Sequence, residues 1–358
     1  MTLAAQARRL VAWFGQSARP LPWRGEPRDP YHVLVSELML QQTQVERVAP
    51  LFAAFVSHFP TLAALAAASE DEVLEAWSGL GYYRRARLLH RLAREVVAGR
   101  GQLPASVAEL RQLPGIGPYT AAAIASLAFG QAEPVLDGNV MRVAARVLAL
   151  AADSRTAAGR RAATAWVRAL MDGTPPALVN EALMELGATV CRPRAPRCAE
   201  CPLAPACQAF SQGTPEAFPP PRPRRASEAH RWVAACCVDD GGRWLLRQVP
   251  EGPILRGLWL PPLADLGVGD DPVTRARALL PLKLDGPPRV FPTVSHSITH
   301  RRITVTPVLF RVRQAAEPGA GWRWADPRRP GLATSSLLAK LAASVPRSQT
   351  SRARNRTA

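Results

Sequence analysis

Four cysteines crowd into one short segment of the chain, in the pattern C-x6-C-x2-C-x5-C. Four thiolates this close in sequence can bind one metal centre, either zinc or an iron–sulfur cluster, and the spacing alone does not choose between them. The candidate ligands are Cys191, Cys198, Cys201 and Cys207. The first two enclose the sequence RPRAPR, so a metal centre would also fix three arginines that suit phosphate contact: Arg192, Arg194 and Arg197.

Three acidic residues stand in largely apolar surroundings. Glu37, in HVLVSELMLQQTQV, lies either at the edge of a solvated helix face or partly buried, and burial would raise its pKa and make it a candidate general acid. Gln41 follows one turn later, so the two could share a pocket. Asp137, in PVLDGNVMRV, suits a helix N-cap or a charge that stabilises a developing cation. Glu181, in VNEALMELGA, reads as structural from its surroundings alone.

The sequence LPGIGPYT sits between two helical stretches. Pro118 suits the first turn of the second helix, where its missing N–H costs nothing. Gly115 and Gly117 let the backbone turn tightly and approach a ligand, and the free N–H groups of the helix start suit a phosphate. This pattern is typical of a helix-hairpin-helix that grips a phosphate, and a plain turn between helices is the alternative.

The elements that must position these residues follow from periodicity. Apolar residues recur at helical spacing in stretches between residues 33 and 171, whereas short apolar and β-branched runs dominate from residue 231 onward. We therefore predict a multidomain protein with a mainly α domain first and an α+β domain second. The predicted bounds are 1–210 for the helical domain (hairpin 104–129, cysteine loop 191–207), 211–229 for a Pro- and Arg-rich linker, 230–345 for the second domain and 346–358 for a basic, disordered tail.

The chain of 358 residues carries 45 Lys and Arg against 28 Asp and Glu, a formal charge of +17. This excess indicates a polyanionic partner, most simply nucleic acid. No apolar run has the length of a membrane span, and no secretory signal is visible. We expect a cytoplasmic monomer, associated with the nucleoid if the source is prokaryotic.

Seven segments, in order, resemble the adenine DNA glycosylases of the endonuclease III superfamily, the MutY family. They are LPWR (21–24), SELMLQQTQV (36–45), GLGYYRRAR (79–87), LPGIGPYTA (113–121), VLDGNVMRV (135–143), NEALMELGA (180–188) and the four-cysteine run. The resemblance implies monofunctional excision of adenine opposite 8-oxoguanine or guanine in double-stranded DNA, by a helix-hairpin-helix glycosylase domain with a [4Fe-4S] cluster rather than zinc. GLWLPP (257–262) and HSITH (296–300) are similar to the family's Nudix-like C-terminal domain.

The resemblance also implies a role for individual residues. Glu37 would protonate the adenine, Asp137 would stabilise the sugar cation, and Tyr119 would assist both. Trp23, Arg24, Gln41 and Glu181 would line the adenine pocket. Gln42 and Tyr82 would wedge into the base stack, and Leu80 would lie beside the estranged base. Thr299 and His300 would sense 8-oxoguanine. Ile298 and Thr299 replace the Phe and Ser of the family's Phe-Ser-His element.

Three alternatives differ in their chemistry. A bifunctional glycosylase would form a Schiff base through a hairpin lysine, but Tyr119 holds that place and the chain has no lysine before Lys283. A Nudix nucleotide hydrolase would need a metal-binding run of the form R-E-x-x-E-E, which does not follow GLWLPP. A non-enzymatic iron–sulfur DNA binder fits the cysteines and the charge equally well, so only the behaviour of Glu37 separates it from an enzyme.

Overall fold

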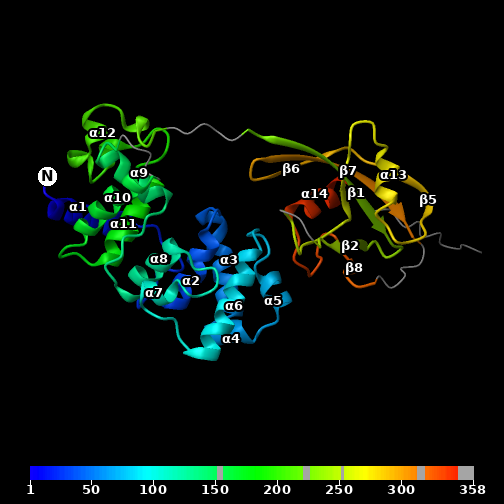
Figure 1. The fold of residues 1–358 in the computed structure, drawn as a ribbon, viewed down its shortest axis with the longest axis horizontal. Helices are drawn as coiled ribbons and strands as arrows, with labels where there is room; N and C mark the ends of the chain where they lie inside the picture. The colour runs from blue at the N-terminus through cyan, green and yellow to red at the C-terminus, as the bar shows by residue number, and fades with distance from the viewer. Residues whose placement is uncertain (151–155, 221–225, 251–253, 313–318, 346–358) are drawn as a thin grey trace, which may run out of the picture. The chain divides into compact units, whose positions relative to one another are not determined.

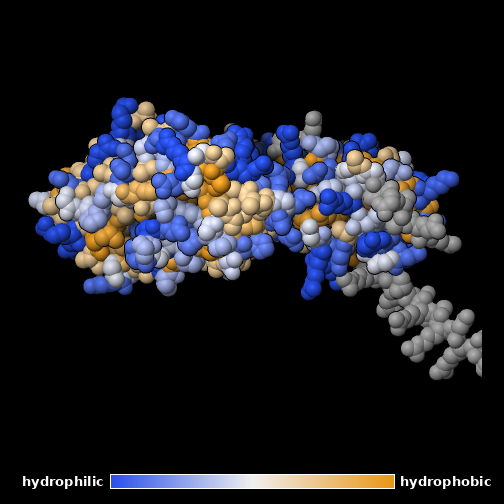
Figure 2. Space-filling model, turned by 90° about the horizontal axis from the view of Figure 1, so that it is seen from below, coloured by the Kyte–Doolittle hydropathy of each residue, from blue (hydrophilic) through white to orange (hydrophobic). Residues whose placement is uncertain are grey.

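The computed structural model describes residues 1–150, 156–220, 226–250, 254–312 and 319–345, and the chain forms two compact units (Figure 1). The first unit takes in Met1–Ala76 and Arg84–Pro223, and the second takes in Trp77–Tyr83 and the chain from Arg224 onward. Figure 2 shows hydrophilic side chains over much of the surface, with apolar patches between them. Among the described residues, no helix has both the length and the apolar character to cross a bilayer.

The first unit is built from helices, most of which begin at a residue whose side chain caps the first turn, as Thr2, Asp29, Asp137 and Thr156 do. The helices are α1 (Leu3–Ser17), α2 (Pro30–Leu40), α3 (Val45–His58), α4 (Leu62–Ala67), α5 (Glu70–Ala76), α6 (Arg84–Gly99), α7 (Val107–Leu110), α8 (Pro118–Phe129), α9 (Gly138–Val147), α10 (Ala157–Leu170), α11 (Pro176–Thr189) and α12 (Gln208–Ser211). Three short 3-10 turns follow the cysteine segment's start: η1 (Cys198–Glu200), η2 (Ala204–Ala206) and η3 (Pro215–Ala217).

Two helices of this unit matter most for the site. The central helix α2 is buried along nearly its whole length, from Tyr31 to Met39, and packs against α3 and α8. Helix α9 instead has one apolar face, which packs with α1, α10 and α11 into a single core beside the cysteine segment. A helix that is apolar on all sides, as α2 is, must lie inside the protein, so the carboxylate of Glu37 on α2 is withdrawn from water.

The second unit is a mixed sheet with one helix on each face (Figure 1). The strand order is β3-β2-β1-β7-β5, with β4 on β1, β6 on β7 and β8 on β2, and the β1–β7 pair is parallel. The bounds are β1 (Glu228–Val238), β2 (Trp244–Gln248), β3 (Trp259–Leu260), β4 (Leu263–Asp265), α13 (Pro272–Arg277), β5 (Asp285–Val290), β6 (Val294–Ile298), β7 (Arg301–Arg311), β8 (Trp322–Ala325) and α14 (Ser336–Ser344). The prediction of a helical domain followed by a mixed-sheet domain is confirmed.

The junction between the units differs in detail from the predicted linker 211–229. The turn η3 lies inside that range, and β1 already begins at Glu228. The physical reason at the near end is Arg146, whose Nε donates to the Phe218 carbonyl oxygen at 3.0 Å and ties this segment to α9. The linker residues 221–225 and the predicted tail 346–358 lie outside the described residues.

Candidate active site

A cavity of about 370 Å³ opens in the first unit, within the range of roughly 300–1,000 Å³ that is usual for small-molecule sites. Its walls come from the LPWR segment and its flanks, α2 and the residues after it, α8, the start of α9, and α11. The cavity brings together eight of the residues singled out in the sequence: Trp23, Arg24, Glu37, Gln41, Gln42, Tyr119, Asp137 and Glu181. Five separate stretches of chain thus converge on one space.

Glu37 is the acid in this cavity that is best suited to hold a proton near neutral pH. Only 5% of the residue is exposed. Burial raises the pKa of Glu37 to about 7, with repulsion from Asp137 and Glu181 adding to the rise and a hydrogen bond from Tyr119 opposing it. Of the two possibilities open from the sequence, the buried position is the one found. A carboxyl group with this pKa is partly protonated at pH 7 and can act as a general acid.

Asp137 serves as the N-cap of α9, and it faces the same cavity. Its Oδ1 accepts from the Val140 N–H at 2.6 Å, and its Oδ2 accepts from Asn139 Nδ2 at 2.9 Å. Burial raises the pKa of Asp137 overall, and these hydrogen bonds and the charge of Arg142 offset part of the rise. The two hydrogen bonds favour the ionised carboxylate, so the capping role and a role in stabilising a cation are compatible.

An ion-pair network forms part of the cavity wall. Arg24 lies between two carboxylates, with Nε 3.3 Å from Glu181 Oε1 and Nη2 2.9 Å from Glu185 Oε2. Arg19 Nε pairs with Glu185 Oε1 at 2.6 Å, and Arg28 Nη2 pairs with Glu181 Oε2 at 2.7 Å. Burial alone would raise the pKa of Glu185, but its bonds to Arg19 and Arg24 lower it overall. Three guanidinium groups therefore fix both carboxylates.

Sequence reasoning missed Arg19, Arg28 and Glu185. A signal for Glu185 was present, because it falls four residues after Glu181 and so shares its helix face. The arginines could have been found only by asking which cations neutralise two buried acids on an apolar helix.

The hairpin LPGIGPYT joins α7 to α8, as the motif predicted. Gly115 has φ +80°, and a Cβ there would lie 2.8 Å from the Cβ of Leu88, so both conformation and packing require glycine. Gly117 is the N-cap of α8 and Pro118 its first residue. Tyr119, one residue further on, lines the cavity, so the same helix start offers N–H groups and a phenol to a ligand.

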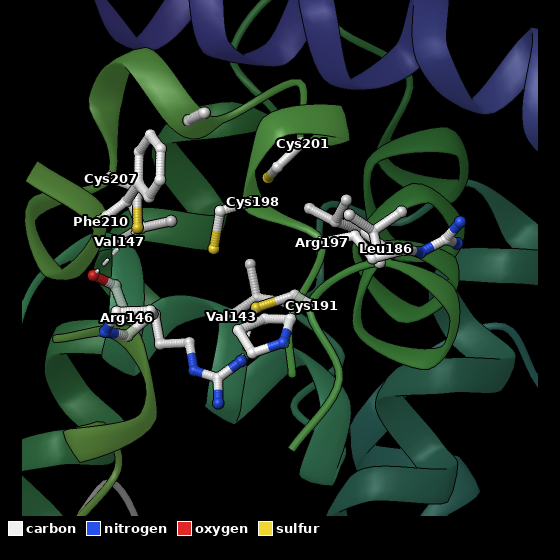
Figure 3. Close-up of a pocket in the computed structure, with 14 residues that line it drawn as sticks. Val143, Arg146, Val147, Leu186, Cys191, Arg197, Cys198, Cys201, Cys207 and Phe210 are labelled. Atoms are coloured by element: carbon white, nitrogen blue, oxygen red, sulfur yellow. Dashed lines mark hydrogen bonds between the residues drawn. The ribbon is translucent and has the colours of Figure 1, made fainter. Parts of the chain in front are cut away.

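The four cysteines line a second pocket, in which their sulfur atoms face one space (Figure 3). All four are free thiols. Burial raises the pKa of Cys201 to about 12, and the neighbouring thiols Cys191, Cys207 and Cys198 add to the rise. With the pKa raised in this way, Cys201 stays an uncharged thiol at neutral pH unless a cation lies beside it. In the described part of the chain, no three His, Cys, Asp or Glu side chains are grouped in a way that would hold a single metal ion.

Helix α9 connects the cavity with the cysteine pocket. Asn139, which donates to Asp137, accepts from Arg142 Nη2 at 2.8 Å, and Arg142 Nε donates to the Cys191 carbonyl oxygen at 2.8 Å. One turn later Arg146 Nη1 donates to Cys191 Sγ at 3.3 Å. Close packing supports this arrangement, because a Cβ at Gly187 would lie 2.5 Å from Asn139 Cβ. The position of Asp137 therefore depends on the cysteine segment.

The remaining predicted site residues lie outside the cavity. The loop arginines Arg192, Arg194 and Arg197 are exposed. Leu80 is buried and Tyr82 is 48% exposed with φ +47°, both in the Trp77–Tyr83 segment. Thr299 (φ +55°) and His300 form the turn between β6 and β7 in the second unit, where His300 Nε2 lies 3.0 Å from Glu228 Oε1.

Residues 35–169 match the family model of the HhH-GPD superfamily base excision DNA repair proteins. The chain is 36% identical over 308 residues to an adenine DNA glycosylase of Arabidopsis thaliana, covering 75% of this chain but only about half (49%) of that relative. It is 39% identical over 282 residues to the adenine DNA glycosylase of Mycolicibacterium smegmatis, covering 77% of this chain and 90% of the relative.

A solved structure of a thermostable thymine-DNA glycosylase is similar to the chain, with a TM-score of 0.53 and 27% sequence identity over 57% of this chain and 95% of that one. The family predicted from the seven segments is confirmed by these relatives. The chain belongs to the adenine DNA glycosylases, within the helix-hairpin-helix superfamily of base excision repair proteins.

Proposed function

We propose that the protein removes adenine paired with 8-oxoguanine or guanine from double-stranded DNA by hydrolysing the N-glycosidic bond. The observation that carries this proposal is the meeting of Glu37, Tyr119 and Asp137 in one cavity, with the pKa of Glu37 raised to about 7. An acid that is half protonated at neutral pH, facing a hydrogen-bonded carboxylate, is the pair that glycosidic bond cleavage needs.

The chemistry follows from this pair. A stacked adenosine cannot reach a buried acid, so the nucleotide must first leave the helix, at a cost of roughly a few kcal/mol. Glu37 then donates its proton to the purine ring, the C1′–N9 bond breaks with its electron pair moving to the base, and adenine departs neutral. The carboxylate of Asp137 stabilises the positive charge left on the sugar. Water adds to C1′ and loses a proton, which leaves an abasic site.

We infer that the ion-paired part of the cavity wall, together with Trp23, holds the adenine. Arg24 and Glu181 line the cavity with fixed side chains, since each oxygen of Glu181 pairs with a different arginine. A carboxylate fixed in this way can only accept hydrogen bonds, and an exocyclic amine is a donor. Trp23 adds an apolar surface on which a ring can pack.

The enzyme should act without lyase activity. A lyase step needs an amine that forms a Schiff base with C1′, and no lysine lines the described part of the cavity. The only lysines of the chain are Lys283 and Lys340. Tyr119 occupies the hairpin position and hydrogen-bonds Glu37 instead.

We propose that Cys191, Cys198, Cys201 and Cys207 hold a [4Fe-4S] cluster. The residues fit this group, because four free cysteines face one pocket, where iron would favour their thiolate forms, and Arg146 donates to the sulfur of Cys191. When bound, the cluster would cross-link the segment through Fe–S bonds. Arg142 and Asn139 would carry that rigidity to Asp137. The exposed arginines of the loop would contact DNA phosphates.

The second unit is proposed as a Nudix-like module that reads the base opposite the adenine, through Thr299 and His300. We propose that this module recognises a base and does not hydrolyse nucleotides, because the α13 segment PVTRAR carries no acidic metal-binding run. Duplex DNA would be the partner, and one copy of the chain would suffice, as both carboxylates come from the same unit.

Adenine release tests the proposal directly. Purified protein is incubated with duplexes that carry A opposite 8-oxoguanine, G, or T, and the free base is measured. Release from the first two and little from the third is expected. Tight binding to all three without any release would instead identify a non-enzymatic DNA binder.

A further inference from the structure

Arg85, on helix α6, is a buried charged residue that the proposed chemistry does not use. Only 8% of it is exposed. Its Nη1 donates to the carbonyl oxygens of Leu38 at 2.7 Å, Met39 at 3.0 Å and Gln41 at 2.5 Å. Its Nη2 donates to Thr43 Oγ1 at 3.3 Å. The guanidinium group therefore spans the end of α2 and the residues that follow it.

The end of α2 is a place where a cation is needed. The last carbonyl groups of a helix have no partner within the helix and carry its negative partial charge. Helix α2 ends at Leu40, and Gln41 turns at once to φ −56° and ψ 111°, so no further helical turn covers these carbonyls. A planar guanidinium group offers several donors in fixed directions, and an ammonium group does not match this geometry.

The segment that Arg85 holds forms the rim of the active-site cavity. Gln41 and Gln42 both line the cavity, and Gln41 Nε2 donates to Thr120 Oγ1 at 3.3 Å, on the hairpin helix α8. Gln42 is exposed and has φ +58°. This left-handed conformation is unfavourable for any residue other than glycine. It persists only where neighbouring contacts fix the chain on both sides, as Arg85 does at Gln41 and Thr43.

We propose that Arg85 is a positioning residue for extrusion of the target nucleotide: it holds the Gln41–Thr43 segment in the shape that presents Gln42 to the DNA base stack. The proposal rests on the proposed function. It means that the rim of the cavity already has, before DNA binds, the shape that helps to open the duplex. Helix α2 also carries Glu37. The Arg85 guanidinium group therefore contacts the end of the same helix that positions both Glu37 and Gln42.

The test compares Arg85→Lys with a matched control, Arg87→Lys, on the same helix. Arg87 Nε pairs with Glu70 Oε1 at 2.9 Å on the outer side of the helix. Single-turnover adenine release is measured on a fully paired duplex with A opposite 8-oxoguanine, and on the same duplex with mismatches flanking the adenine, which make extrusion easy. On the paired duplex we expect Arg85→Lys to be slower by up to about 100-fold, the scale of a misplaced group about 1 Å from its productive position. On the flanked duplex most of this loss should disappear, and Arg87→Lys should match the wild type on both.

A double-mutant cycle with Gln42→Ala locates the effect. If Arg85 acts through Gln42, the double variant should be about as slow as Gln42→Ala alone on the paired duplex. Equal losses on both duplexes, or additive losses in the cycle, would show that Arg85 only supports the fold and would overturn the proposal. Gln42 is exposed, so Gln42→Ala should fold even if Arg85→Lys does not. If Gln42→Ala releases adenine from the paired duplex as fast as the wild type does, the proposal is also refuted. A wild type that releases no adenine would refute the proposed function itself.

Discussion

The raised pKa of Glu37 makes the rate of base release depend on pH in a way that can be worked out from the structure. With a pKa of about 7, about half of the Glu37 side chains are protonated at pH 7, whereas at the ordinary value of 4.5 only about 0.3% would be. Burial therefore raises the population of the active acid by about 160-fold at this pH. Asp137 must be ionised, so the rate should also fall in acid and give a bell-shaped profile.

The assay is single-turnover adenine release from a duplex with A opposite 8-oxoguanine, at constant ionic strength and with saturating enzyme. Between pH 6 and pH 8 the protonated fraction of a group with pKa 7 falls from about 91% to about 9%, so the rate constant should fall about tenfold. A rate that stays flat or rises across this interval would refute the assignment of Glu37 as the proton donor.

The same pKa predicts a change in stability. A carboxyl group whose pKa is higher in the folded protein contributes stability that is present below its unfolded pKa, near 4.5, and lost as the pH rises through 7. A glutamine at position 37 stays neutral throughout. Between pH 5 and pH 8 the free energy of unfolding of the wild type should therefore fall by about 2–3 kcal/mol relative to Glu37→Gln. If denaturant titrations gave the same difference in unfolding free energy between the wild type and Glu37→Gln at pH 5 and at pH 8, a buried Glu37 with a raised pKa would be contradicted.

Further predictions concern the second carboxylate, the α9–α11 contact, the cysteine pocket and the reaction type. Asp137→Asn keeps a capping side chain but loses the charge, so base release should fall by at least about 100-fold with little change in melting temperature. Gly187→Ala forces a Cβ against Asn139 and should cost about 1–3 kcal/mol of stability, whereas Gly15→Ala, a helix position with open space, should not destabilise; equal effects would contradict the packing argument. Cys198→Ser should lower iron content and visible absorption together with activity, and a protein that keeps its iron would contradict the ligand assignment. Borohydride should trap no covalent DNA adduct in an active reaction, and efficient trapping would reveal a lyase.

Part of the active site could be predicted from short segments with strong local signals, whereas Trp23, Arg24 and Tyr119 were predicted only from the family resemblance. The capping position of Asp137, the apolar surroundings of Glu37 and the Pro and Gly residues of the hairpin each follow from local physical chemistry. The helical periodicity of the first 210 residues and the β-branched runs after residue 231 likewise predicted the two kinds of domain.

The parts that could not be predicted depend on contacts between residues far apart in the chain. Glu185 pairs with Arg19 across 166 positions, and Arg85 caps a helix that ends 45 residues earlier. A Pro-rich composition indicated a linker from residue 211, yet Arg146 holds Phe218 against α9. Such long-range pairings leave no local periodicity, so single-sequence reasoning has no signal for them.

The role of Glu37 as the proton donor is tested most directly by comparing adenine release by Glu37→Gln with its binding to the same mispaired duplex. Glutamine has nearly the same shape as the protonated acid but cannot donate a proton in its place, and general acid catalysis supplies about 10²–10⁴-fold of the rate. We predict that adenine release falls by at least this factor while the dissociation constant for the A:8-oxoguanine duplex stays within about threefold of wild type. Release at the wild-type rate, or a parallel loss of binding, would contradict the account.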